Sequence, residues 1–295
     1  MNLEPCVVVV KRTVLERGGR AARLARAGHA TADRLVPAAD EQHRTVAAVM
    51  EALRRRGIAP PRFSVDALDR SACRLLSRAR FVVTVGGDGT FLTASHHIQD
   101  GVALAVNSAP RDSIGHFCLT NRHGFEASLR SVEVGKLRPI SLSRLTATLD
   151  GRRLPERATN DVLIAHDHPA ATSRYRLTVG RYGEEHRSSG LWISTAAGST
   201  AGIRSAGGKP MPLRSRRLQY RVRELYREPG RHYRLAAGLL TPRESLVVDS
   251  KMEAGWLFID GARTAYRFRF GAHLEVRVSE QPLLLFADPS RWASE

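Results

Sequence analysis

The sequence predicts a Rossmann-like α/β domain followed by a β-sandwich-like domain. In the first part, short β-branched strands alternate with helix-prone segments, which is typical of a mainly parallel sheet. Near Pro139 the pattern changes to short alternating strands separated by turn residues, which favours a β-rich domain. We therefore assign residues 1–138 to the α/β domain and 139–280 to the β domain. The segment 281–295, with the apolar run Leu283–Phe286, is a candidate for return to the first domain.

The elements of the α/β domain are expected in strict alternation. The expected strands are Cys6–Val10, Arg62–Val65, Phe81–Val85 and Val102–Val106. The expected helices are Thr13–Ala27, a helix capped by Asp40 that ends at Arg54–Gly57, Leu68–Ser77, and a helix that starts near Thr90, with Gly28–Pro37 as a loop. In a sheet of this kind, ligands bind at the carboxyl ends of the strands.

The β domain opens with a strand over Ile140–Leu149, which ends in the hairpin signal Asp150-Gly151. The further expected strands are Val162–Ile164, Tyr175–Val179, Leu191–Ile193, Leu246–Val248, Trp256–Ile259, Tyr266–Phe270 and Leu274–Val278.

The chain is strongly basic, with a formal net charge of +17. Of its 46 basic residues, four are lysines and 46 − 4 = 42 are arginines, spread from Arg12 to Arg291. A surface that binds a nucleic-acid duplex concentrates its cations on one face, so we expect no nucleic-acid partner. A positive field attracts small anionic substrates such as dinucleotides, ATP or polyphosphate.

The three cysteines lie far apart, without the spacing of a zinc site or a disulfide framework. No apolar run reaches the length that spans a membrane. We therefore expect no metal held by a cysteine or histidine cluster, no membrane partner and a cytoplasmic location.

The run Gly86-Gly87-Asp88-Gly89-Thr90 follows the third expected strand and precedes a helix. Glycines let a ligand approach the backbone, and the N–H groups of a helix start attract an anion. A carboxylate in such a loop would repel a phosphate unless it holds a metal or takes a proton, so Asp88 is a candidate general base or magnesium partner. The alternative is a capped turn in which Asp88 caps the helix.

This loop resembles the signature of the superfamily that joins NAD kinases to diacylglycerol and sphingosine kinases. The loop Asn107–Cys118, with His116 and the following Leu119-Thr120, is similar to the NAD kinase loop at this position, and is nearest to the mitochondrial branch. A structural or surface histidine remains an alternative for His116.

Two later motifs extend the resemblance. Asn160-Asp161 stands where NAD kinases have Asn-Glu, and Ser188–Gly208 is similar to the family's second motif. In this chain Ser189 replaces an aspartate and Gly202 replaces an aromatic residue, which removes a stacking surface for adenine. Asp260-Gly261 matches a late Asp-Gly of the family, although by itself it is a hairpin signal. The resemblance covers roughly residues 81 to 290 and four motifs in family order.

The resemblance implies phosphorylation of the 2′-hydroxyl of the adenosine ribose of NAD or NADH, with Mg²⁺ and with ATP or polyphosphate as donor. It implies Asp88 as the base and Gly86, Gly87, Gly89 and Thr90 at the phosphate. The implied NAD-binding residues are Asn107, His116, Asn160, Asp161, Ser189, Thr195, Ser199, Thr200, Ala201 and Ser205. NAD kinases pair their β domains with a partner subunit, which implies a homo-oligomer. The alternatives are a lipid kinase and a dinucleotide sensor with little turnover.

The segment Leu213–Leu235 is dense in arginine and tyrosine. It is either a phosphate-binding or dimer-contact segment, or a solvated connection between strands.

Overall fold

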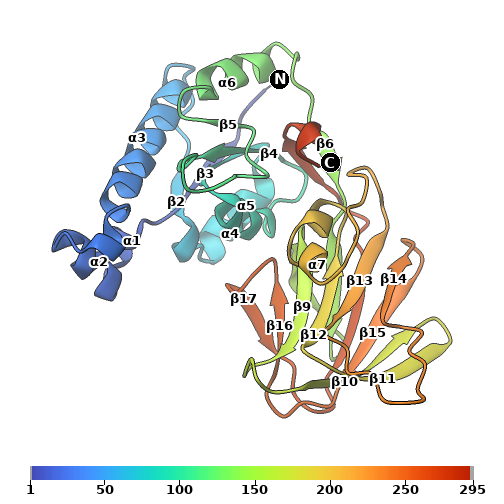
Figure 1. Cartoon of the computed structure of the whole chain (residues 1–295). Helices are drawn as coiled ribbons and strands as arrows, with labels where there is room; N and C mark the ends of the chain where they lie inside the picture. Colours follow the sequence, from blue (N-terminus) through green and yellow to red (C-terminus); the bar gives the residue numbers. More distant parts are fainter. Residues whose placement is uncertain (1, 293–295) are drawn as a thin grey trace. The chain divides into compact units, whose positions relative to one another are not determined.

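A computed structural model describes residues 2–292 and contains an α/β unit and a β-sandwich unit (Figure 1). The first compact unit extends to Ile140 and also includes Leu283–Asp288. The second consists of Ser141–Pro282 and the residues from Pro289 onward. No helix within residues 2–292 is long and apolar enough to cross a membrane.

The α/β unit is built on a sheet with the strand order β2-β1-β3-β4-β19-β6, with β5 paired to β4. These strands are β1 (Cys6–Val10), β2 (Arg62–Ser64), β3 (Phe81–Gly86), β4 (Val102–Asn107), β5 (Thr120–Asn121), β6 (Ile140–Leu142) and β19 (Leu283–Phe286). Strands β1, β2, β3, β4 and β19 pair in parallel. Every residue of β3 and β4 is buried, as expected for strands covered on both faces. Lys11, Gly86 and Asn107 therefore meet at the carboxyl edge of the sheet.

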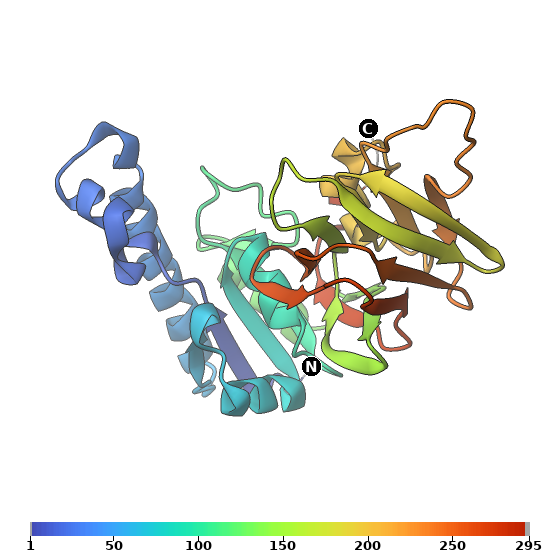
Figure 2. The same ribbon diagram turned by 90° about the horizontal axis from the view of Figure 1, so that it is seen from below.

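The helices of this unit are α1 (Val14–Arg17), α2 (Gly19–Arg26), α3 (Leu35–Arg54), α4 (Arg70–Arg78), α5 (Asp88–Ser95) and α6 (Phe125–Glu133). Helices α3 and α6 share one core with the sheet, in which Val49, Leu53 and Leu129 pack on Val8 and Val83. Figure 2 shows α1, α2 and α3 (blue) on the side of the sheet that ends in β1 and β2.

The first two expected helices differ from the prediction. Gly18 and Gly19, with φ of 77° and 82°, divide the expected first helix into α1 and α2. Helix α3 starts at Leu35 instead of being capped by Asp40, because Pro37 is tolerated in a first turn, where no intrahelical N–H bond is lost.

The second unit is a sandwich of two six-stranded sheets, ordered β11-β10-β15-β18-β7-β8 and β14-β13-β12-β9-β16-β17. The strands are β7 (Leu145–Leu149), β8 (Arg152–Ala158), β9 (Asp161–His166), β10 (Ser173–Val179), β11 (Tyr182–Ser188), β12 (Gly190–Ser194), β13 (Leu218–Arg223), β14 (Ala237–Leu240), β15 (Ser245–Ser250), β16 (Gly255–Ile259), β17 (Thr264–Arg267) and β18 (His273–Val278). Both sheets contribute to one core, in which Tyr175 and Leu177 of the first are clustered with Leu191 and Ile193 of the second. The predicted hairpin at Asp150-Gly151 joins β7 to β8.

The expected strand Ile140–Leu149 is wrong as a single element. It is divided at Ser143-Arg144 into β6 and β7, which belong to different sheets. Arg144 is fully buried there, and its guanidinium donates to the carbonyls of Gln281 (3.1 Å) and Pro282 (3.2 Å). A buried guanidinium must be hydrogen-bonded. Arg144 therefore links the segment between β6 and β7 to the segment that directly precedes β19.

The sequence prediction missed β8, β11, β13 and β14. Strand β13 lies inside Leu213–Leu235 and pairs with β12, so the interpretation of this whole segment as a solvated connection is wrong. Leu218, Tyr220 and Val222 are buried in the core, while the arginines alternate with them. Strand β17 ends at Arg267, three residues before the predicted end.

Candidate active site

In the α/β unit, the glycine loop connects the buried strand β3 to α5. Gly87 is the N-cap of α5, so Asp88 is the first helical residue and not the cap, and the helix begins two residues before Thr90. The first N–H groups of a helix have no intrahelical partner and create a positive end that attracts anions. The start of α5 therefore lies at the carboxyl edge of the sheet, where its N–H groups have the direction and polarity that attract an anion.

The glycines of this loop are required for different reasons. A Cβ on Gly86 would lie 2.4 Å from Oγ1 of Thr90 and 3.0 Å from Cβ of Lys11, so the fold itself excludes a side chain there. A Cβ on Gly89 would meet no atom within 4 Å, and Gly89 is exposed. Packing therefore does not require a glycine at position 89.

The half-buried carboxylate of Asp88 is held by the neighbouring loop. Its Oδ2 accepts a hydrogen bond from the backbone N–H of His116 and its Oδ1 accepts one from that of Phe117, both at 2.8 Å. Phe117 is buried and stacks on Phe91 of α5, with ring centroids 4.9 Å apart. These contacts fix the Asp88 side chain in one orientation. The loop after β4 therefore contacts the glycine loop directly.

Two predicted NAD-binding residues of this unit have structural partners. Asn107 is buried; its Nδ2 donates to the carbonyl of Ser113 (2.8 Å) and its Oδ1 accepts from the N–H of Ala109 (3.0 Å). Asn107 therefore shapes the loop. The half-buried ring of His116 lies edge-on to Phe117, with centroids 5.9 Å apart.

In the sandwich unit, Asp260 organises the predicted Asn160-Asp161 motif. Its carboxylate accepts hydrogen bonds from the N–H groups of Thr159 (2.8 Å), Asn160 (2.7 Å) and Asp161 (2.9 Å). Asp260 stands in the turn after β16 with φ of 51°, a left-handed conformation that Asp tolerates better than most residues. The sequence prediction noted Asp260 as a hairpin residue and missed this role, because its partners lie about a hundred residues away.

The side chain of Asp161 is 5% exposed, and Nδ2 of Asn160 donates to its Oδ2 at 3.0 Å. Burial, and secondarily the nearby charge of Asp260, raises the pKa of Asp161 to about 8. The carboxyl group is thus largely protonated at neutral pH, and can donate a hydrogen bond as well as accept one. A neutral Asp161 beside the Asn160 amide can recognise a sugar hydroxyl or a base edge.

The predicted hydroxyl residues separate into two groups. Thr195 and Ser199 are fully buried: Oγ1 of Thr195 donates to the carbonyl of Thr159 (2.6 Å), and Oγ of Ser199 donates to that of Ala196 (2.7 Å) and accepts from the N–H of Met211 (2.8 Å). These two hydroxyls hold the segment together. The other three hydroxyl residues, Ser189, Thr200 and Ser205, are more exposed, and their side chains make no hydrogen bond within residues 2–292. Ala201 of the predicted set is half-buried and has no polar side chain.

The sequence of this chain is similar to those of known NADH kinases. No family model matches the chain. The NADH kinase of Arabidopsis thaliana is 38% identical over 233 residues, which cover 69% of this chain and 71% of the relative. The probable NADH kinase of Oryza sativa subsp. japonica is 36% identical over 225 residues, which cover 69% of each chain. The chain belongs to the NAD kinase family.

Solved structures agree with the NAD kinase fold. An NAD kinase from Archaeoglobus fulgidus in complex with ATP superposes with a TM-score of 0.67 at 19% identity, covering 98% of this chain and 96% of the other. Yeast NADH kinase complexed with NADH gives a TM-score of 0.66 at 14% identity, covering 97% and 84%. At these identities the likeness shows the fold alone.

Gly202, which replaces the aromatic residue of the NAD kinase pattern, packs against the indole of Trp192. A Cβ on Gly202 would lie 2.8 Å from Cζ2 and 3.1 Å from Cη2 of Trp192, so the indole of Trp192 requires a glycine at 202. Trp192 is half-buried on β12, and the guanidinium carbon of Arg223 lies 5.9 Å from its ring centroid. An aromatic ring of β12 therefore lies beside Gly202, where this chain lacks the aromatic residue of the family pattern.

Proposed function

We propose that this protein is an NAD kinase that transfers the terminal phosphate of ATP or polyphosphate to the 2′-hydroxyl of the adenosine ribose of NAD or NADH. Membership of the NAD kinase family supports the reaction class. The observation that carries the residue assignment is the carboxylate of Asp88, which two backbone N–H groups hold at the first turn of α5, beside the open position of Gly89.

Asp88 is the proposed general base. A carboxylate has about four lone-pair sites, and the N–H groups of His116 and Phe117 use two of them. Asp88 therefore keeps acceptor capacity for the proton of the ribose hydroxyl. General-base catalysis contributes roughly 10²–10⁴-fold, so most of the acceleration must come from positioning and from charge stabilisation at the phosphate.

The loop of Gly86, Gly87, Gly89 and Thr90 is the proposed phosphate site, with backbone N–H groups of the α5 start as donors. We propose Mg²⁺ as the cofactor. Residues 2–292 contain no cluster of three or more His, Cys, Asp or Glu side chains suited to a metal. Mg²⁺ is commonly held by one or two carboxylates, waters and substrate phosphates, and the remaining acceptor capacity of Asp88 fits such a site. The cation would neutralise charge on the donor phosphates.

The proposed NAD contacts of the sandwich unit are the Asn160-Asp161 pair, the hydroxyls of Ser189, Thr200 and Ser205, and the backbone at Ala201. Thr195 and Ser199 support this segment from within. In this proposal Asn107 and His116 belong to the NAD site of the α/β unit, with Asn107 acting by shaping its loop.

The decisive assay incubates the protein with ATP and Mg²⁺ and with NAD, NADH or a diacylglycerol in separate reactions, and identifies products by mass spectrometry. A 2′-phosphorylated dinucleotide supports the proposal, and the ratio of NADPH to NADP formed reports which dinucleotide is preferred. Phosphorylation of the lipid alone would favour a lipid kinase. Tight NAD binding with no product in any reaction would favour a sensor.

The proposal includes a homo-oligomer of at least two chains in the cytoplasm. Strand β14 is a sheet edge on which Leu239 is 46% exposed, and free sheet edges are sites of strand pairing. The free cysteines Cys6, Cys73 and Cys118 suit a reducing compartment. Light scattering across a dilution series tests the assembly: a monomer that keeps full activity at low concentration would contradict it.

A further inference from the structure

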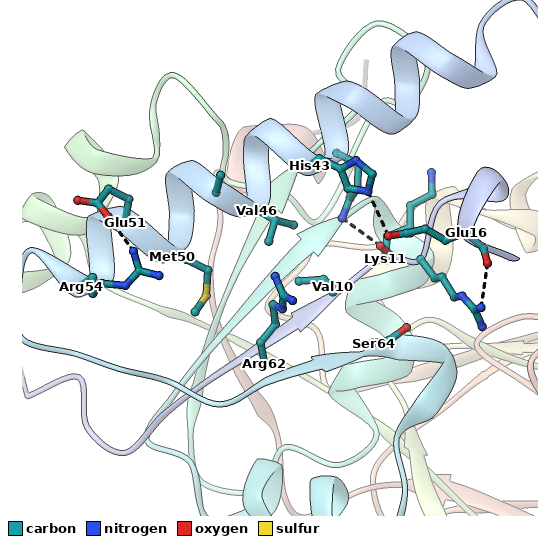
Figure 3. A pocket seen from close by; sticks show the side chains of 13 residues that line it. Val10, Lys11, Glu16, His43, Val46, Met50, Glu51, Arg54, Arg62 and Ser64 are labelled. Atoms are coloured by element: carbon teal, nitrogen blue, oxygen red, sulfur yellow. Dashed lines mark hydrogen bonds and ion pairs between the residues drawn. The ribbon is translucent and has the colours of Figure 1, made fainter.

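The α/β unit contains an open groove of about 1030 Å³ along α3, beside the carboxyl end of β1 and the edge strand β2 (Figure 3). Its lining includes Lys11, whose N–H donates to the carbonyl of Val85 at 2.8 Å. Val85 directly precedes the glycine loop. The groove therefore adjoins the proposed kinase site of this unit.

The sandwich unit contains a second pocket, of about 290 Å³, and all of its lining residues belong to this unit. Part of the lining comes from β10 and β11, and the connection from β13 to β14 runs beside β11 (Figure 1). The N–H of Tyr226 in this connection donates to the carbonyl of Arg187 at 2.9 Å. Lys251, after β15, and Phe270, before β18, complete the lining. None of these residues has a role in the proposed kinase site.

The lining of this pocket carries a net positive charge. Its cations are Arg174, Arg187, Arg231 and Lys251, and its carboxylates are Glu185 and Glu228, which gives 4 − 2 = +2. Glu228 pairs with Arg231 (3.2 Å) and with Arg187 (3.6 Å), and Glu185 pairs with Lys251. Both carboxylates are thus neutralised within the lining, and positive charge remains for an anionic ligand.

Two of the cations lie opposite each other on neighbouring strands. Arg174 of β10 is paired in register with Arg187 of β11, and both residues are exposed. Like charges directly opposite each other destabilise a sheet, and the side chain of Arg174 has no ion pair or hydrogen bond within residues 2–292. Guanidinium groups bind phosphate oxygens in a forked geometry. A phosphate between these arginines would therefore replace their repulsion by two attractive contacts.

His186 contributes a buried acceptor to the same pocket. Its side chain is 1% exposed, and its Nε2 lies 3.2 Å from Oε2 of Glu184. Burial lowers the pKa of His186, so at neutral pH the ring is neutral, with the Nε2 proton on the side of the carboxylate. Nδ1 is then an acceptor, and it is buried without a hydrogen-bond partner in the described part of the chain. Because such atoms are rare in native proteins, Nδ1 indicates a missing hydroxyl or N–H donor.

Phe270 gives the pocket an apolar side. The residue is 64% exposed although it lines the pocket, so its ring lies at the solvent side of the lining. The volume of 290 Å³ is at the lower limit of ordinary ligand pockets, which are about 300–1,000 Å³. The pocket therefore suits a small organic anion better than a whole dinucleotide.

We propose that this pocket binds a small hydroxylated phosphate ester of the sugar phosphate class. The phosphate lies between Arg174 and Arg187, a hydroxyl group points toward His186, and the carbon skeleton lies beside Phe270. This site goes beyond the proposed kinase function and does not depend on it, because no lining residue takes part in the phosphoryl transfer.

Ribose 5-phosphate is the probe, with inorganic phosphate and unphosphorylated ribose as comparison ligands. Binding is measured by calorimetry at constant ionic strength on the full chain, with and without NAD and ATP. Arg174→Glu removes the unpaired cation, and Phe270→Ala removes the apolar side. The matched control is Arg153→Glu, which makes the same charge change at an exposed position of β8, in the same sheet but outside the pocket.

We expect one ribose 5-phosphate per chain, weaker binding of inorganic phosphate and no binding of ribose. Arg174→Glu should weaken both phosphates by about tenfold or more, because it removes a charge-assisted contact and adds a repulsive carboxylate. It should leave the melting temperature of the free protein unchanged or higher, since opposite charges then face each other across β10 and β11. Phe270→Ala should weaken ribose 5-phosphate alone. In histidine-labelled protein, ribose 5-phosphate should shift the Nδ1 resonance of His186.

Failure of both phosphate ligands to bind the unmodified protein would overturn the proposal. So would an equal loss of affinity in Arg153→Glu, which would mean that the general positive field attracts the anion. Binding that NAD or ATP abolishes and that Arg174→Glu leaves unchanged would place the ligand in the kinase site instead. An unshifted His186 resonance at saturation would contradict the hydroxyl contact. None of these measurements requires phosphoryl transfer, so their outcome is independent of the kinase assay.

Discussion

The substitution Asp88→Asn tests both the catalytic and the anchoring role of this carboxylate. Each carboxylate oxygen accepts one backbone N–H at 2.8 Å, from His116 and from Phe117. An asparagine can accept with Oδ1 alone, and its NH₂ group then faces the other N–H. The variant loses one charge-assisted hydrogen bond, weakens the second and leaves a half-buried donor unpaired.

The expected loss of stability in Asp88→Asn follows from these two hydrogen bonds. Hydrogen bonds to charged groups contribute about 1.5–3 kcal/mol each, so we expect the free energy of unfolding to fall by about 2–4 kcal/mol, the larger value applying if the loop does not relax. The loss of the base should lower kcat by at least about a hundredfold. Because both effects come from one side chain, stability and turnover must be measured on the same preparation.

Denaturant unfolding gives the stability change, steady-state kinetics give kcat, and calorimetry gives the affinity for NAD. Asp112→Asn is the matched control, since Asp112 lies in the same loop and its 3.3 Å ion pair with Arg34 is exposed. Exposed pairs contribute about 0–1 kcal/mol, so the control should be nearly neutral. Near-normal turnover in Asp88→Asn would remove Asp88 as the base, and unchanged stability would refute the anchoring role.

Three further substitutions separate packing from ligand contact. Gly89→Ala should leave the protein as stable or up to about 1 kcal/mol more stable, since alanine favours a helix, yet lower kcat/KM by about tenfold or more; full activity would show that no ligand approaches Gly89. Trp192→Ala should raise the KM for NAD about 5- to 150-fold, because base–aromatic stacking is worth about 1–3 kcal/mol, and loss of the NAD-induced quenching of tryptophan fluorescence in the variant gives an independent measurement; an unchanged KM would exclude stacking. Asp161→Asn should flatten the pH dependence of thermal stability: the pKa of Asp161 is raised from 3.8 to about 8 in the folded state, so its contribution is greatest below pH 3.8 and is lost as the pH rises toward 8. If the melting temperature of the variant falls between pH 4 and 8 as steeply as that of the unmodified protein, the result would contradict a buried, protonated Asp161 carboxyl.

Local patterns in the sequence determined the parts of this protein that depend on neighbouring residues. The run Phe81–Val85 followed by glycines predicted a strand, a phosphate loop and a helix, because β-branched residues favour strands and glycine relieves steric limits where a ligand approaches. The change of period near Pro139 predicted the β unit. The order of the four motifs predicted the NAD kinase family, which the plant relatives confirm.

The tertiary structure decided what depends on partners distant in the chain. No local signal reports that Asp260 binds the N–H groups of Thr159, Asn160 and Asp161, or that the ring of Trp192 fills the space beside Gly202. Hydrogen bonds and ring contacts act over a few ångströms in space, whatever the separation along the chain. The same reason applies to the hydroxyl residues of the second motif. The hydroxyls of Thr195 and Ser199 bind backbone carbonyls inside the fold, while those of Thr200 and Ser205 are more exposed and can contact a ligand. Only the packing around each residue distinguishes the two groups.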